Sequence, residues 1–85
     1  RYQVHYSKPA QKDIIKLSPQ VRKRLQKKLE FFYSQPNPLH FAESLTEPAD
    51  AQYRFRVGDY RILFDVEDMT MKILRVQHRR EVYRK

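Results

Sequence analysis

Three arginines alternate with apolar residues between Tyr53 and Asp65, in the segment Y-R-F-R-V-G-D-Y-R-I-L-F-D. In an extended chain successive side chains point to opposite faces, so Arg54, Arg56 and Arg61 are expected on one face of a sheet. A guanidinium group offers a planar fork of donors that matches a phosphate or a carboxylate. A solvated sheet face usually mixes charges, but here no acidic residue joins the arginines before Asp65. The spacing therefore predicts an anion-binding surface.

The turn inside this segment is predicted at Gly58-Asp59. A pair of this kind between two alternating runs is typical of a two-residue hairpin loop, and Gly58, the only glycine of the chain, can supply the positive φ. This loop places Arg56 directly across from Arg61. Like charges in that position repel each other, so we expect an anion from outside the chain to compensate them.

A last strand is predicted from about Met71 to His78, with Leu74 and Val76 on the core face. This alternation sends Arg75 and Arg79 towards the arginine face of the hairpin. His78 has an unperturbed pKa of about 6.5, which suits proton transfer, but a histidine satisfied at a strand end is an equally open interpretation. The spacing of the three histidines resembles no metal-ligand pattern, so no metal or other cofactor is expected.

The first part of the chain predicts a strand and two helices. Tyr2, Val4 and Tyr6 alternate with polar residues, as in a short strand. Ser7 can cap a first helix and Ser18 a second, each with a proline in its first turn.

The second helix is expected to be amphipathic. Its apolar stripe consists of Val21, Leu25, Leu29 and Phe32. Its other faces carry Arg22, Lys23, Arg24, Lys27 and Lys28. Such a run is usually the solvated side of a helix, and it also suits a phosphate backbone, so both interpretations stand.

The order of elements predicts an α+β fold in a single domain of residues 1–85. A strand and a two-helix hairpin precede a loop from His40 to Ala51, in which Phe41 and Leu45 are expected to close the edge of the core. A three-stranded antiparallel meander follows, and the tail from Arg79 to Lys85 is expected to form a basic turn or short helix.

Composition restricts the partners. The 85 residues carry a net charge of +8 with a pI near 10, which indicates a polyanionic partner, either nucleic acid or an acidic protein. The chain has no cysteine, which suits a cytoplasmic protein. No apolar run approaches the roughly 20 residues that span a bilayer, and no membrane partner is expected.

The hairpin segment, followed by L-R-V-Q-H-R-R-E-V-Y-R at residues 74–84, resembles the RelE/ParE superfamily of type II toxin–antitoxin toxins, and is closer to its RelE branch. The resemblance covers essentially the whole chain and implies a RelE-like fold. It also implies a toxin that is inactivated in a complex with a cognate antitoxin, whose C-terminal segment is acidic and helical. RelE-like toxins cut mRNA on the ribosome without a metal and leave a cyclic phosphate, whereas ParE-like toxins poison DNA gyrase.

The resemblance also assigns candidate site residues. The RelE pattern is matched by Arg54, Arg56, Arg61, Arg79 and Tyr83, with His78 as a further candidate for proton transfer. Two of these positions, 54 and 56, are commonly lysine in that branch, and arginine is a poor proton acceptor. Arg61 and Arg79 are expected to clamp the phosphate. Arg54 and Arg56 are expected to place the RNA. The residues expected to bind RNA elsewhere are Arg22, Lys23, Lys27, Arg75 and Arg80. A gyrase-binding toxin and a plain RNA-binding module remain the alternatives.

Overall fold

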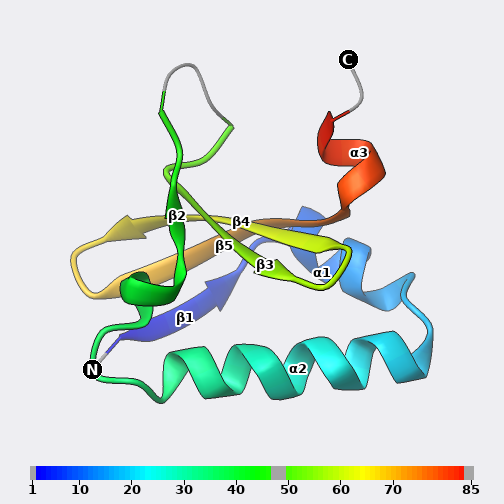
Figure 1. The fold of residues 1–85 in the computed structure, drawn as a ribbon, viewed down its shortest axis with the longest axis horizontal. Coiled ribbons are helices and arrows are strands. Elements are labelled where there is room, and N and C mark those ends of the chain that lie inside the picture. Colours follow the sequence, from blue (N-terminus) through cyan, green and yellow to red (C-terminus); the bar gives the residue numbers. More distant parts are fainter. Residues whose placement is uncertain (1, 47–49, 84–85) are drawn as a thin grey trace.

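The computed structural model describes residues 2–46 and 50–83, the last two of them as backbone only. The elements follow in the order β1 (Gln3–Tyr6), α1 (Lys8–Ile15), α2 (Pro19–Tyr33), the 3-10 helix η1 (Pro38–Phe41), β2 (Glu43–Ser44), β3 (Tyr53–Val57), β4 (Tyr60–Glu67), β5 (Thr70–His78) and α3 (Arg79–Tyr83). Within the described residues the strands form one sheet in the order β1-β5-β4-β3-β2. Helix α2 lies across one face of this sheet, and α3 stands on the opposite side (Figure 1). The predicted α+β architecture is confirmed.

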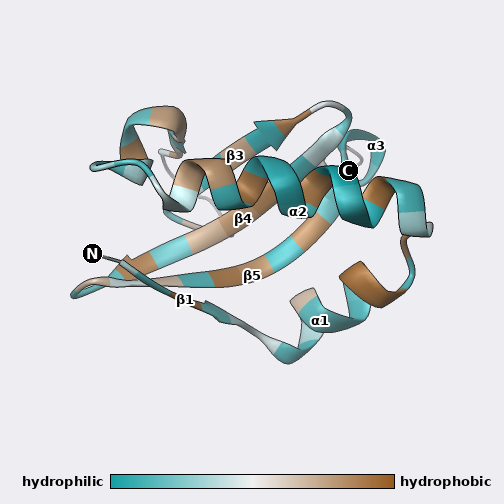
Figure 2. Ribbon diagram, turned by 90° about the horizontal axis from the view of Figure 1, so that it is seen from below, coloured by the Kyte–Doolittle hydropathy of each residue, from teal (hydrophilic) through white to brown (hydrophobic). Residues whose placement is uncertain are grey.

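The two faces of the sheet differ in character. We call the face that packs against α2, and carries Phe55 and Ile62, the inner face. The outer face carries Arg54, Arg56 and Arg61. Figure 2, seen from the side of α2, shows hydrophobic positions recurring along α2 and along the strands behind it.

The hairpin of β3 and β4 has the predicted register. Val57 pairs with Tyr60 and Arg56 with Arg61. Gly58 adopts φ 58°, and a Cβ added there would meet no atom within 4 Å. The glycine is therefore required by the backbone conformation and not by lack of space.

Both helix starts follow the predicted capping. The Ser7 hydroxyl accepts a hydrogen bond from the backbone N–H of Ala10 at 3.1 Å, and the Ser18 hydroxyl accepts one from Val21 at 3.3 Å. Each helix has a proline in its first turn, where no backbone donor is lost.

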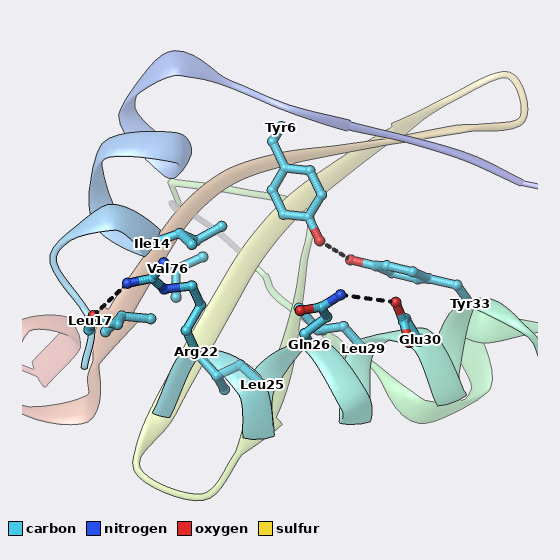
Figure 3. A pocket seen from close by; sticks show the side chains of 10 residues that line it. All are labelled: Tyr6, Ile14, Leu17, Arg22, Leu25, Gln26, Leu29, Glu30, Tyr33 and Val76. Atoms are coloured by element: carbon cyan, nitrogen blue, oxygen red, sulfur yellow. Dashed lines mark hydrogen bonds between the residues drawn. The ribbon is translucent and has the colours of Figure 1, made fainter. Parts of the chain in front are cut away.

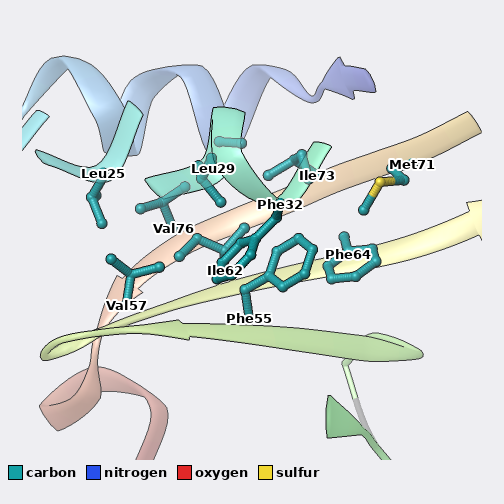
Figure 4. Close-up of a cluster of buried hydrophobic side chains, with 11 residues drawn as sticks. Leu25, Leu29, Phe32, Phe55, Val57, Ile62, Phe64, Met71, Ile73 and Val76 are labelled. Atoms are coloured by element: carbon teal, nitrogen blue, oxygen red, sulfur yellow. The ribbon is translucent and has the colours of Figure 1, made fainter. Parts of the chain in front are cut away.

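The core lies between α2 and the inner face (Figure 4). From the predicted stripe of α2, Leu25, Leu29 and Phe32 are buried, and Val21 packs at its edge. The Phe55 ring stacks between the rings of Phe32 and Phe64, with centroid distances of 4.6 Å to each. Apolar burial of this kind is the main force that holds α2 on the sheet.

Strand β5 departs from simple alternation. Leu63 pairs with Arg75 but the next residue, Phe64, pairs with Ile73, so Leu74 is an extra residue on β5. Such a bulge reverses which side chains face inward on its two sides. The fully buried residues before it are Met71 and Ile73, and the buried residue after it is Val76. The prediction that Leu74 lies on the core face with Val76 is therefore wrong for Leu74, which is half-buried.

The segment predicted as a loop after α2 contains two short elements. In η1, the Phe41 ring stacks on Phe32 at 5.3 Å. Strand β2 then pairs antiparallel with β3, and Glu43 lies opposite Arg54. The prediction of a featureless loop is wrong here, because a two-residue strand leaves no periodic signal.

Strand β1 is parallel to β5 and lies at the far edge of the sheet. Beyond its end, the Ser7 hydroxyl donates to the Leu74 carbonyl at 2.9 Å, so the start of α1 continues along β5. None of the helices among the described residues is long and apolar enough to cross a membrane.

The positive φ of Gly58 gives a first prediction. Gly58→Ala should lower the free energy of unfolding by about 1–2 kcal/mol, since a side chain in the left-handed region is strained. Gly58→Asn should cost less, because Asn tolerates this region. Asp68, which also has φ 58°, provides the matched control, and Asp68→Gly should not lose comparable stability. Urea unfolding measures all three; equal losses at both turns would contradict the explanation.

Candidate functional site

The predicted arginines meet on the outer face of the sheet. Arg54 and Arg56 project from β3, and Arg61 projects from β4 directly opposite Arg56. Their environments differ strongly, because the side chain of Arg56 is 55% exposed and that of Arg54 19%. Arg61 as a residue is only 2% exposed.

A carboxylate from β2 completes this group. The Arg54 Nε donates to Oε1 of Glu43 at 2.8 Å, and the Arg56 Nη1 donates to Oε2 at 3.4 Å. The expectation that the counter-anion comes only from outside the chain is therefore wrong for these two arginines. Glu43 was missed because it lies in a segment without periodicity, and only the pairing of β2 with β3 brings it here.

The pKa of Glu43 lies below its ordinary value. The hydrogen bond from Arg54 is the largest cause, and the charges of Arg54 and Arg56 add to it against a smaller opposing effect of burial. The site thus holds an ionised carboxylate beside two guanidinium groups. Such a carboxylate can accept a proton, which arginine cannot do near neutral pH.

Arg61 is not the exposed clamp that the sequence suggested. Its Nη1 donates to the carbonyls of Gly58 at 2.9 Å and Tyr60 at 3.0 Å, and so folds back on the hairpin turn. Its Nε is buried and has no hydrogen-bond partner within the described part of the chain. An anion can reach this guanidinium only if the residues that cover it move.

Helix α3 begins beside the same turn. The backbone N–H of Arg79 donates to the Asp59 carbonyl at 2.6 Å, and α3 stands over this end of the outer face (Figure 1). The Arg79 and Arg80 side chains are exposed. Tyr83 belongs to α3 by its backbone, and its side chain lies outside the described residues.

His78 ends β5 away from the arginines of β3. In the register of the sheet it pairs with Tyr60, on the inner face, and the two rings meet edge to face at 5.3 Å. Its Nδ1 accepts a hydrogen bond from the backbone N–H of Arg80 at 3.2 Å. This geometry leaves Nε2 as the position at which His78 can exchange a proton.

Arg75, an expected RNA contact, is bound within the protein. Its Nε and Nη2 donate to the Asp13 carboxylate at 2.8 and 3.0 Å, and the backbone N–H of Val76 donates to the same group at 2.8 Å. Burial raises the pKa of Asp13, but these hydrogen bonds and the charge of Arg75 outweigh it, so the pKa is lowered overall. Arg75 therefore links β5 to α1.

Three other expected RNA contacts lie on the helix side of the molecule, whereas Arg80 lies on α3. Arg22, Lys23 and Lys27 are exposed on α2, and Arg22 also donates to the Leu17 carbonyl at 3.2 Å. Because α2 covers the inner face, these cations and the outer-face arginines form two separate basic surfaces.

A groove of about 400 Å³ also lies on the helix side, between α1 and α2 (Figure 3). Tyr6 and Tyr33 close one end of it through a hydrogen bond of 2.9 Å between their hydroxyls. Burial is the largest cause that raises the pKa of both phenols, so they remain protonated. Its lining is mostly apolar and includes none of the outer-face arginines, so it is not the anion site.

Comparison with known proteins agrees with this fold. Residues 4–83 match the family described as the ParE toxin of type II toxin-antitoxin system, parDE. Toxin RelG of Mycobacterium tuberculosis is 32% identical over 88 residues, which cover 99% of this chain and 98% of the relative. The toxin-antitoxin complex RelBE2 of the same organism contains a chain with a TM-score of 0.72 and 31% identity, over 91% of this chain and 96% of that chain. A chain in the RelB-RelE complex of Methanococcus jannaschii has a TM-score of 0.70 and 26% identity, over 93% and 94%. The resemblance expected from the sequence is confirmed.

The contact between Glu43 and Arg54 gives a second prediction. In an NMR titration the Glu43 carboxyl should have its midpoint below the ordinary value of about 4.3. Arg54→Gln should raise this midpoint more than Arg56→Gln, because the Arg54 contact is shorter. Since the folded-state pKa is depressed, the stability that this carboxylate contributes is present above the unfolded pKa and is lost as the pH falls through the folded value. Glu43→Gln should remove that part of the acid sensitivity; an ordinary midpoint in the wild-type protein would contradict the ion pair.

Proposed function

The chain belongs to the ParE toxin family of type II toxin–antitoxin systems, and from this premise we propose that it is a ribosome-dependent mRNA endonuclease that inhibits translation. The observation that carries the proposal is the outer-face group in which a carboxylate, Glu43, lies within hydrogen-bond distance of Arg54 and Arg56. A protein that only binds RNA needs the arginines but not a proton acceptor between them. The similarity to toxins named RelG and RelE supports the same branch.

The reaction is an attack of a ribose 2′-oxygen on the adjacent phosphorus. The 2′-hydroxyl proton passes to a base, the bond from phosphorus to the 5′-oxygen breaks, and that oxygen receives a proton. The products are a cyclic phosphate and a free 5′-hydroxyl, and no metal takes part. Catalysis needs in-line geometry and relief of the charge on the phosphorane.

The outer-face group supplies the phosphate contact and the base, and residues beyond it supply the acid and hold the RNA. Arg56 is the most exposed of the three outer-face arginines and is the first to meet a phosphate. Arg54 holds Glu43, which accepts the 2′-hydroxyl proton. Tyr83 returns a proton to the 5′-oxygen, because His78, the other candidate, faces inward at the end of β5. The cations Arg22, Lys23, Lys27 and Arg80 hold the RNA backbone.

The clamp role of Arg61 and Arg79 depends on the ribosome. Arg61 is 2% exposed and α3 begins beside it, so the free protein does not present the complete clamp. Binding to the ribosome supplies the free energy that exposes Arg61 and orders the message.

A cognate antitoxin completes the biological unit. RelBE2 and the RelB–RelE structures are toxin–antitoxin complexes. The net charge of +8 and two basic surfaces suit an acidic, helical antitoxin segment that covers the arginines.

The proposed cleavage gives a third prediction. Arg56→Ala should slow single-turnover cleavage of ribosome-bound mRNA by about 100-fold or more, by analogy with the loss of an oxyanion donor. Glu43→Gln should slow it as well and flatten the acidic limb of the pH profile. Arg24→Ala, which removes an exposed arginine from α2, is the matched control and should leave the chemical step unchanged. Wild-type rates in both outer-face variants would rule out this site.

A fourth prediction concerns RNA without ribosomes. Because Arg61 is covered in the free protein, purified toxin should cut naked RNA far more slowly than the same message in a programmed ribosome. Gel analysis of 5′-labelled RNA at physiological salt measures the ratio of the two rates. Equal rates would contradict a ribosome-dependent clamp.

The ParE family match keeps one alternative from a different class, a toxin that poisons DNA gyrase without nuclease chemistry. The burial of Arg61 favours this alternative, since a protein that binds through its surface needs no accessible clamp. Expression in cells separates the two functions. Cut mRNA with arrested translation supports the endonuclease, whereas DNA breaks with intact mRNA support the gyrase poison.

A further inference from the structure

Two phenylalanine rings lie open to solvent, one in the last turn of α2 and one at the end of η1. Phe31 is 47% exposed and Phe41 is 39% exposed. Their centroids are 5.7 Å apart with the rings nearly perpendicular, at 68°. Phe41 also stacks on Phe32, which is 5% exposed, at 5.3 Å. The exposed rings are therefore fixed to the core and do not move freely.

Lysines and a histidine lie beside these rings. The Lys28 Nζ lies 5.5 Å from the centroid of Phe31, and the His40 ring meets Phe41 edge to face at 5.5 Å. Residues three and four apart share a helix face, so Lys27 and Lys28 both neighbour Phe31 on α2. Arg24 extends the same basic side by about one further turn.

The acidic side chains nearest in sequence are directed elsewhere. Glu30 lines the groove between α1 and α2 and accepts a hydrogen bond from Gln26. Glu43 is held on the outer face by its two arginines. The surface made of Lys27, Lys28, Phe31, His40 and Phe41, here called the aromatic–basic patch, thus combines open rings with positive charge.

Exposed aromatic rings beside a line of cations are the arrangement that proteins use for single-stranded nucleic acid, in which bases stack and phosphates meet lysines. A stable protein partner needs about 800 Å² on each side, more than two half-open rings provide, whereas one base needs only a ring face. We propose that the aromatic–basic patch binds an unpaired base of single-stranded RNA, which stacks on Phe31 or Phe41 while Lys27 and Lys28 contact the flanking phosphates.

This patch lies on the helix side of the molecule, away from the outer-face arginines. A strand bound there does not compete with one bound over Arg56. The inference rests on the RNA-binding part of the proposed function and not on cleavage, so it holds whether or not Glu43 acts as a base.

Equilibrium binding of the full chain to a labelled eight-nucleotide oligoadenylate, followed by fluorescence anisotropy, tests the proposal. Phe31→Ala and Phe41→Ala together should weaken binding roughly 5- to 150-fold, the effect expected for loss of one stacked base. The slope of affinity against salt should stay the same, because no phosphate contact is removed. Lys28→Gln should instead reduce that slope by about 0.7, as expected for one contact to a single strand.

Ile15→Ala is the matched control, because Ile15 is 71% exposed on α1 and lies apart from the patch. It should bind RNA like the wild-type protein, and melting temperatures confirm that all variants fold. Wild-type affinity in the double phenylalanine variant overturns the stacking site. The site is also overturned if sedimentation shows that the protein self-associates and that this variant abolishes the self-association without a change in RNA affinity. If the wild-type chain binds no oligoadenylate at low salt, the RNA-binding function fails together with this site. If the wild-type chain binds oligoadenylate through this patch but cleaves no ribosome-bound mRNA, only the proposed nuclease function is contradicted.

Discussion

A column of stacked rings holds the two layers of the protein together. It runs from Phe41 through Phe32, Phe55 and Phe64 to Tyr53, with centroid distances between 4.6 and 5.5 Å. Its three central rings, Phe32, Phe55 and Phe64, are buried, and neighbouring rings gain further from offset stacking. Since Phe55 and Phe64 must point inward to join the column, the residues beside them must point outward. The arginine surface is therefore a direct consequence of the core.

The same column explains why two basic surfaces can coexist on so small a chain. Sheet and helix separate the outer-face arginines from the cations of α2, which limits the repulsion that a net charge of +8 would otherwise produce. Carboxylates from neighbouring elements also pair with two of the sheet arginines, Asp13 with Arg75 and Glu43 with Arg54. The lysines of α2 extend into solvent, where water screens them.

Features set by neighbouring residues could be predicted from the sequence, and features set by distant residues could not. The register of Arg56 opposite Arg61 follows from a two-residue turn, and the caps at Ser7 and Ser18 follow from local hydrogen bonding. The approach of Glu43 to Arg54 depends on a strand of two residues. The burial of Arg61 was missed for a related reason. The two-residue alternation along a strand indicates the face on which a side chain lies but not what covers that face. The extra residue at Leu74 likewise carries no glycine or proline that would signal a bulge.

The pairing of the first strand with the last affects how the chain can fold. Ser7 and Leu74 are 67 residues apart, yet their hydrogen bond extends the parallel edge formed by β1 and β5. Helix α1 depends on the same late strand through Asp13. Contacts across such a long stretch form slowly, because closing the loop costs chain entropy before the contact contributes any stability. During synthesis β1 and α1 therefore have no sheet to join until β5 has emerged. The edge formed by β1 and β5 is therefore completed only after β5 has been synthesised.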